Sequence, residues 1–148
     1  MLSLTLAQAV TIVDEALAEA GRRKAAPLCV AVLDAGGHLI ALKREDKASL
    51  LRPQIAVAKA KSVLGMGLGG RELANRAASM PAFFANLSAL TYGAMVPAPG
   101  GILLRDDEGD IVGAVGISGD TSEIDEICGL VGIRATRLKP DAGTAPAS

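Results

Sequence analysis

The chain has 148 residues with a formal net charge of −1, and half of its residues are hydrophobic. This length predicts one domain, and the near-neutral charge argues against a nucleic-acid-binding protein, which needs a basic face to displace counterions from phosphate. The hydrophobic content excludes intrinsic disorder, although aromatic residues make up only 2% of the chain. A chain this short and this apolar has more apolar surface than one core can bury. We therefore expect self-association to a dimer or larger oligomer.

The first predicted element is an amphipathic helix. Thr5 and Gln8 have the spacing of a capping box, and apolar residues then recur at i, i+3 and i+4 over about 16 residues. Residues 28–33 form an uninterrupted apolar run of strand length. Residues 34–37 predict a turn and residues 39–43 a second strand, which together make the clearest hairpin in the sequence.

Helical segments fill the middle of the chain. One helix is predicted from about residue 51 to 64, with Pro53 in its first turn. Two shorter helices are predicted over 71–79 and 81–90, after a glycine-rich loop at 65–70. Small residues on the first of these helices favour a close approach to the sheet.

The last third predicts a second hairpin and a final helix. The strands span 102–105 and 111–118, and Ser122 with Asp125 is interpreted as a capping box that opens the helix. Hairpins between helices favour an antiparallel sheet with helices packed on it. We expect a single domain over residues 1–138 and a flexible C-terminal tail over 139–148.

No segment predicts secretion or membrane insertion. The N-terminus lacks a basic stretch, Asp14 and Glu15 interrupt its apolar run, and no run approaches the roughly 18 residues of a membrane helix. We therefore expect a cytoplasmic protein without membrane or nucleic-acid partners. Cys29 and Cys128 lie in apolar surroundings and are interpreted as buried thiols rather than a disulfide.

Several motifs are set aside on spacing. The run from Gly65 to Gly70 matches G-x-G-x-x-G, but a helix precedes it and no acidic residue follows at the distance a dinucleotide site needs. His38 is the sole histidine and falls in a hairpin turn, which disfavours a catalytic triad and a metal site. The acidic residues of the second hairpin are interpreted as a solvated tip: Asp106, Asp107, Glu108 and Asp110.

The candidate site combines charged residues with glycine-rich turns. Arg44 and Asp46 leave a strand two residues apart and are expected to face one side, while the long stem of Lys59 is expected to bring its amine to the same end. The alternative is that Arg44 and Asp46 pair with each other and close a loop. Turn amides and a helix N-terminus attract anions. The predicted ligand-binding residues are Pro99, Gly100, Gly101, Ser118 and Gly119.

These residue types suit acid–base chemistry on a small polar or anionic metabolite. Asp46 is the candidate base, and Lys59 is the candidate acid or imine-forming amine. Arg44 would bind a carboxylate, and the glycine amides would stabilise an oxyanion. The first hypothesis is therefore a lyase, isomerase or hydratase without a cofactor or metal.

Ordered segments from about Thr5 to Ala135 carry a family resemblance. They are residues 27–41, 44–48 and 58–60, then 99–102 and 111–119, and finally Asp125 with Gly132. In these segments the chain resembles the GlcG/HbpS-like family, also called the heme-degrading domain family and related to the C-terminal domain of PduO-type proteins. The resemblance implies a profilin-like α/β/α fold with a five-stranded antiparallel sheet, and dimers that often assemble further, commonly to octamers.

The resemblance also supplies the second function hypothesis, a heme- or corrinoid-binding accessory protein; a structural assembly subunit is the third. Family members usually have an aromatic residue near position 42 and other residues around Asp46, where this chain has Leu42, Glu45 and Lys47. Heme is thus a candidate cofactor, bound weakly and without His38 as an obligatory ligand. The candidate iron ligands are Met66, Met80, Met95 and Tyr92.

Overall fold

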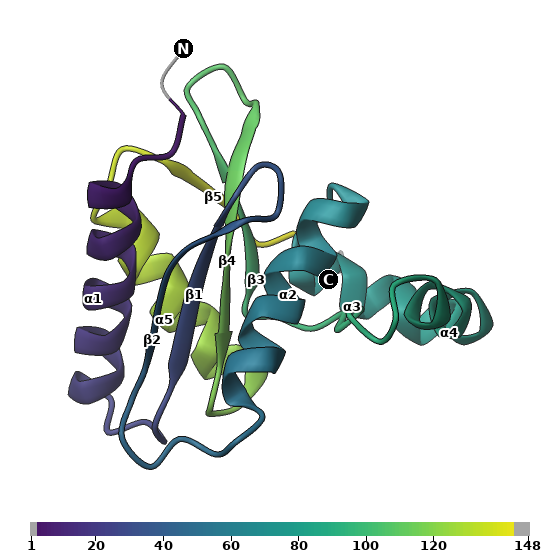
Figure 1. The fold of residues 1–148 in the computed structure, drawn as a ribbon, viewed down its shortest axis with the longest axis horizontal. Helices are drawn as coiled ribbons and strands as arrows, with labels where there is room; N and C mark the ends of the chain where they lie inside the picture. Colours follow the sequence, from purple (N-terminus) through teal and green to yellow (C-terminus); the bar gives the residue numbers. More distant parts are fainter. Residues whose placement is uncertain (1–2, 144–148) are drawn as a thin grey trace, which may run out of the picture.

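The structure of the protein is a computed structural model that describes residues 3–143 (Figure 1). Its strands are β1 (Cys29–Asp34), β2 (Leu39–Arg44), β3 (Gly101–Arg105), β4 (Ile111–Ser118) and β5 (Lys139–Asp141). Its helices are α1 (Leu6–Arg22), α2 (Arg52–Met66), α3 (Gly70–Ser79), α4 (Pro81–Leu90) and α5 (Ser122–Arg134). No helix among residues 3–143 is long and apolar enough to cross a membrane.

The strands form one antiparallel sheet of five in the order β2-β1-β4-β3-β5. Helices α1 and α5 cover one face and α2 covers the other (Figure 1). Side chains alternate across β1: Val30 and Val32 pack toward α1 and α5, whereas Ala31 and Leu33 pack toward α2. A strand covered on both faces must be apolar throughout. The expected α/β/α sandwich with a five-stranded antiparallel sheet is confirmed.

The capping box predicted at the start of α1 is present. The Thr5 hydroxyl accepts from the Gln8 backbone N–H at 3.1 Å, and the Gln8 side chain accepts from the Thr5 N–H at 3.0 Å. α1 then packs along α5, where Gly132 allows close approach. A Cβ on Gly132 would press on the Ile12 carbonyl.

α2 lies directly against β4 because the contact residues are small. Ala56 and Ala60 are fully buried, and a Cβ added at Gly116 would collide with the Ala56 carbonyl. This packing fixes the depth of α2 over the sheet. It turns Lys59 inward, whereas Lys61 stays exposed.

α3 and α4 form an arm that extends away from the sandwich on the α2 side (Figure 1). α4 buries Phe84 but leaves Phe83 48% and Leu90 73% exposed. The glycine-rich segment before the arm is shorter than predicted, because Gly65 lies within α2 and Gly70 begins α3. A Cβ added at Gly70 would collide with the Ala98 carbonyl, so only glycine fits at this position.

Two details near the C-terminus differ from the sequence predictions. Thr121, not Ser122, caps α5, and its hydroxyl accepts from the Ile124 N–H at 3.3 Å. Residues 139–141 are strand β5 rather than part of a loose tail, and Asp141 accepts from Arg105 on β3 at 3.0 Å. Residues 144–148 of that expected tail lie outside the described residues.

Candidate functional site

A buried ion pair joins the two helical layers at one end of the sheet. Lys59 of α2 and Asp125 of α5 are 4% and 1% exposed, and their Nζ and Oδ2 atoms lie 3.2 Å apart. Lys59 also donates to the Ile117 carbonyl at 2.8 Å, and the Asp120 N–H donates to Asp125 Oδ1 at 3.0 Å. Lys59 therefore has Asp125, not Asp46, as its carboxylate partner.

Burial dominates the electrostatics of this pair. Desolvation lowers the pKa of Lys59 and raises the pKa of Asp125, and the attraction between the two charges opposes both shifts. Burial thus favours the neutral form of each group, and the opposite charge of the partner stabilises the charged form of each. Through these contacts Lys59 links α2 to α5 and to the end of β4, which is a structural role. A catalytic role for it stays a prediction.

The glycines predicted to bind a ligand surround the pair and are explained by crowding. Gly100 has a φ of +104°, and a Cβ there would lie 3.0 Å from Lys59 Nζ and 2.9 Å from the Ile117 carbonyl oxygen. A Cβ on Gly101 would lie 2.7 Å from the Lys59 carbonyl oxygen, and the Gly101 N–H donates to Ala98 at 3.4 Å. That amide is thus already used inside the turn formed by Pro99 and its neighbours.

Ser118 and Gly119 complete the same end of β4. The Ser118 side chain is fully buried and accepts from Arg52 Nη1 at 3.0 Å, which ties the first turn of α2 to the sheet. A Cβ on Gly119 would collide with the Pro27 carbonyl. Asp120 follows and accepts from the Ala26 N–H at 2.8 Å. Backbone donors, Ala26 first, lower the pKa of Asp120.

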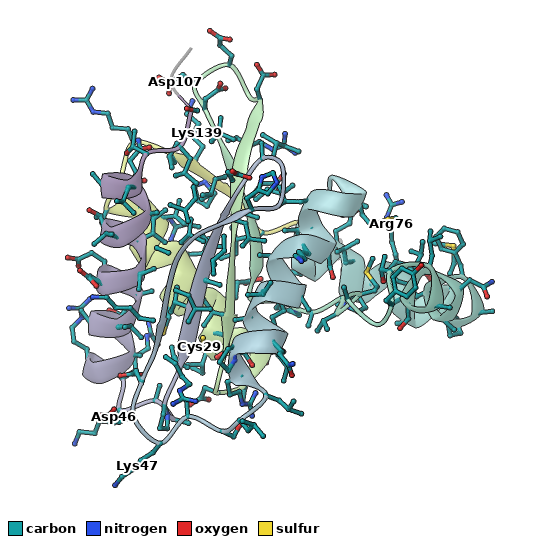
Figure 2. All side chains as sticks on the ribbon, in the orientation of Figure 1. Cys29, Asp46, Lys47, Arg76, Asp107 and Lys139 are labelled. Carbon is teal, nitrogen blue, oxygen red and sulfur yellow. The ribbon has the colours of Figure 1, made fainter. Side chains whose placement is uncertain are left out.

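Arg44 and Asp46 lie elsewhere, at the exit of β2. Both line a groove of about 430 Å³ together with Leu17, Ala25, Pro27, Lys43 and Glu45, which agrees with their predicted common side. Within residues 3–143 they form no ion pair with each other, so the alternative of a closed Arg44–Asp46 pair is wrong. Figure 2 shows Asp46 and Lys47 at the outer end of the β2–α2 connection.

Arg44 pairs across the sheet with Cys29, which pairs with Ser118. Two strand spacings of about 4.8 Å therefore separate the backbones of Arg44 and Ser118. The sequence-predicted set is divided between a buried cluster and a surface groove. Asp125 and Arg52 were missed. Asp125 had the spacing of a capping residue, and nothing local showed that its partner lay 66 positions earlier.

A larger groove of about 570 Å³ runs along the outer face of α2. Its α2 side consists of Pro53, Gln54, Val57, Ala58 and Lys61, and its other side is the turn after α4, formed by Tyr92, Gly93 and Ala94. The volume lies within the range of small-molecule sites. Tyr92 was considered from the sequence only as one of several iron ligands, and the structure places it at this groove.

The remaining candidates have local explanations. His38 Nδ1 lies 3.2 Å from Asp34 Oδ1 in the β1–β2 turn, and its side chain is 81% exposed. Cys29 and Cys128 are free and buried, as expected. They lie on opposite faces of the sheet, and desolvation raises the pKa of each thiol to about 11. Figure 2 places Cys29 between the sheet and α2.

The acidic hairpin tip is a hydrogen-bonded turn. Carboxylate oxygens of Asp106, Glu108 and Asp110 lie within 4.8 Å of one another. Asp106 Oδ1 accepts the N–H groups of Glu108 and Asp110, each at 2.9 Å. These hydrogen bonds stabilise the turn and explain why the acidic residues lie close together at the hairpin tip.

The fold defines an α/β protein whose antiparallel sheet carries helices on both faces, with a groove along α2. The chain belongs to the family described as haem degrading protein HbpS-like, whose model matches residues 4–134. This confirms the family resemblance seen in the sequence. None of the curated proteins matches the chain significantly.

Solved structures resemble the chain over nearly its whole length. A PduOC:heme complex is 25% identical with a TM-score of 0.84, covering 93% of this chain and 98% of the other. Klebsiella pneumoniae protein ORFY, assigned to DUF336, is 23% identical with a TM-score of 0.80 and 90% coverage of both chains. A Streptomyces reticuli HbpS double mutant is 24% identical with a TM-score of 0.78, covering 91% and 88%.

Proposed function

We propose that this protein is a heme-binding accessory protein and that heme binds in the groove along α2. The observation that carries the proposal is the likeness to the PduOC:heme complex over 93% of the chain, within a family described as haem-degrading. The catabolic lyase hypothesis has less support. Its candidate acid and base lie apart, with Lys59 paired to Asp125 and Asp46 at a different groove.

The α2 groove has the chemistry that heme requires. Heme is a flat apolar ring with an iron that takes axial ligands and with carboxylate groups at one edge. Pro53, Val57 and Ala58 supply an apolar wall, Tyr92 supplies a phenol, and Lys61 supplies a cation. Bound heme would supply one-electron and oxygen chemistry, while this chain would bind and orient it.

We further propose that the protein works as an oligomer in the cytoplasm. The apolar side chains exposed on the α3–α4 arm beside the groove support self-association, because burying them in a second copy removes them from water. A partner subunit would also cover the open side of the groove. Light scattering should give a particle larger than the 15.0 kDa chain at micromolar concentration. A monomer would contradict the proposed assembly.

A hemin titration tests the function. We expect a saturable shift of the Soret band at a stoichiometry of one heme per chain or less, the latter if subunits share the site. A control titration with the unfolded protein should give no such shift. A native protein that leaves the hemin spectrum unchanged would refute heme binding, and catabolic metabolites would then be the ligands to test.

A further inference from the structure

Two side chains of the α2 groove have no partner within residues 3–143. Tyr92 is 98% exposed, and its hydroxyl takes part in no hydrogen bond there. Lys61 is also exposed, and its amine takes part in no ion pair there. Both residues line the groove. The groove therefore presents one oxygen donor and one cation, each available to a ligand.

The backbone holds Tyr92 in place at the groove. It has a φ of +54°, a left-handed conformation that aromatic residues rarely adopt, and Gly93 follows with a φ of +82°. The turn is fixed by the Tyr92 N–H, which donates to the Ala89 carbonyl at 3.2 Å, and the Gly93 N–H, which donates to Ser88 at 2.7 Å. This turn brings residues 92–94 opposite α2.

We propose that Tyr92 binds the heme iron through its phenol oxygen and that Lys61 binds a heme carboxylate. This proposal rests on the proposed heme binding in the α2 groove. The phenol O–H bond would break and an oxygen–iron bond would form as the axial water of ferric hemin is displaced. The proton would pass to solvent, and the oxidation state of the iron would not change. Tyrosine is an established axial ligand in heme proteins.

The other candidate iron ligands do not line this groove. Met66 and Met95 pack against the core beneath α3, and Met80 lies between α3 and α4. His38 lies in the β1–β2 turn against Asp34. Tyr92 is therefore the candidate ligand that the groove itself presents.

The iron ligand is tested by titrating ferric hemin into the protein and into Tyr92→Phe, which keeps the ring and removes only the hydroxyl. We expect the native complex to show a phenolate-to-iron charge-transfer band and the corresponding resonance Raman bands. Tyr92→Phe should lose both and bind at least tenfold more weakly. His38→Ala is the control and should keep the native spectrum. Thermal melts should show that both variants fold.

The carboxylate contact is tested with two probes, hemin and hemin dimethyl ester, in which the carboxylates are blocked. Lys61→Met should weaken binding of hemin several-fold and leave binding of the ester unchanged. Lys47→Met, which removes an exposed lysine away from the groove, should affect neither probe. Equal weakening of both probes by Lys61→Met would overturn the assigned role of Lys61.

The outcomes separate this inference from the proposed function. If the native protein binds hemin and Tyr92→Phe gives the same spectrum and affinity, heme binding stands and the ligand assignment is wrong. If His38→Ala alone loses the native spectrum, the iron lies at the β1–β2 turn and the assignment is also wrong. If the native protein does not bind hemin, the proposed function fails and this inference fails with it.

Discussion

Replacing Lys59 by Met should destabilise the protein strongly at neutral pH. The substitution leaves Asp125 buried at 1% exposure without its cation, and it removes the donor to the Ile117 carbonyl. Breaking a buried ion pair by removing one partner typically costs about 3–5 kcal/mol. An exposed ion pair would contribute at most about 1 kcal/mol. The burial of Lys59 and Asp125 places this pair in the costlier class.

The charge of Asp125 sets a limit on this loss and gives it a pH dependence. In the variant, Asp125 can take up a proton instead of remaining charged. Protonation at pH 7 of a group whose unfolded pKa is about 3.9 costs about 4 kcal/mol, since each pH unit corresponds to about 1.4 kcal/mol. The folded pKa of Asp125 is raised further in the variant. The Lys59→Met variant therefore keeps its stability below the pKa that Asp125 has in the unfolded chain. It loses that stability as pH rises through the pKa that Asp125 has in the folded protein.

Urea unfolding of the parent and variant at a fixed protein concentration measures this loss. We expect about 3–5 kcal/mol at pH 7, which corresponds to a Tm lower by about 6–20 °C, and a loss near 1 kcal/mol at pH 4. Lys61→Met on the same helix is the matched control and should change stability little. Asp125→Asn should also lose stability at pH 7, because it leaves the Lys59 amine buried without its carboxylate. This loss should shrink at alkaline pH, where Lys59 can be neutral. A Lys59→Met variant within about 1 kcal/mol of the parent at pH 7 would refute the reasoning.

Three further predictions concern the thiols, the Asp120 carboxylate and a glycine. Cys29 and Cys128 should resist a thiol reagent at pH 8 and react only on unfolding, because burial raises both pKa values to about 11; fast reaction in the native state would contradict this. Asp120 has a lowered pKa, so its contribution to stability is present above about pH 3.8 and lost as pH falls through the folded value. The acid unfolding curve of Asp120→Asn should accordingly be flatter than that of the parent. Gly100→Ala should destabilise more than Gly37→Ala, because both have positive φ but only Gly100 faces atoms within 3.0 Å; equal losses in urea unfolding would leave the crowding without effect.

Much of the fold could be predicted because local patterns and tertiary packing agree. The apolar period of α1, the continuous apolar run of β1 and the two turn segments each indicate the element that forms. β5 could not be found in this way. It has three residues, includes Pro140 and is held by pairing with β3 and by the Arg105–Asp141 contact. Neither feature leaves a local pattern.

The site was harder to predict because its contacts join distant parts of the chain. Lys59 is a lysine on an otherwise apolar helix, and this made it a candidate for a special role. Its partner Asp125, however, resembled a helix cap in the sequence. The glycines near residue 100 suggested room for a ligand. They are required instead because β4 brings the Ile117 carbonyl, and α2 brings Lys59, into the space a side chain would fill. A glycine in a sequence does not distinguish clearance for a ligand from clearance for the protein itself.

The two lysines of α2 show how one helix can serve both the fold and the proposed site. Residues two positions apart on an α-helix point about 200° apart, so Lys59 and Lys61 must face nearly opposite directions. Lys59 is buried against the sheet and held by Asp125, and this anchors the helix at a fixed depth and rotation. That rotation turns Lys61, with Val57 and Ala58, toward the groove. The buried ion pair can therefore be essential to the groove without contacting a ligand, because it sets which face of α2 the ligand meets.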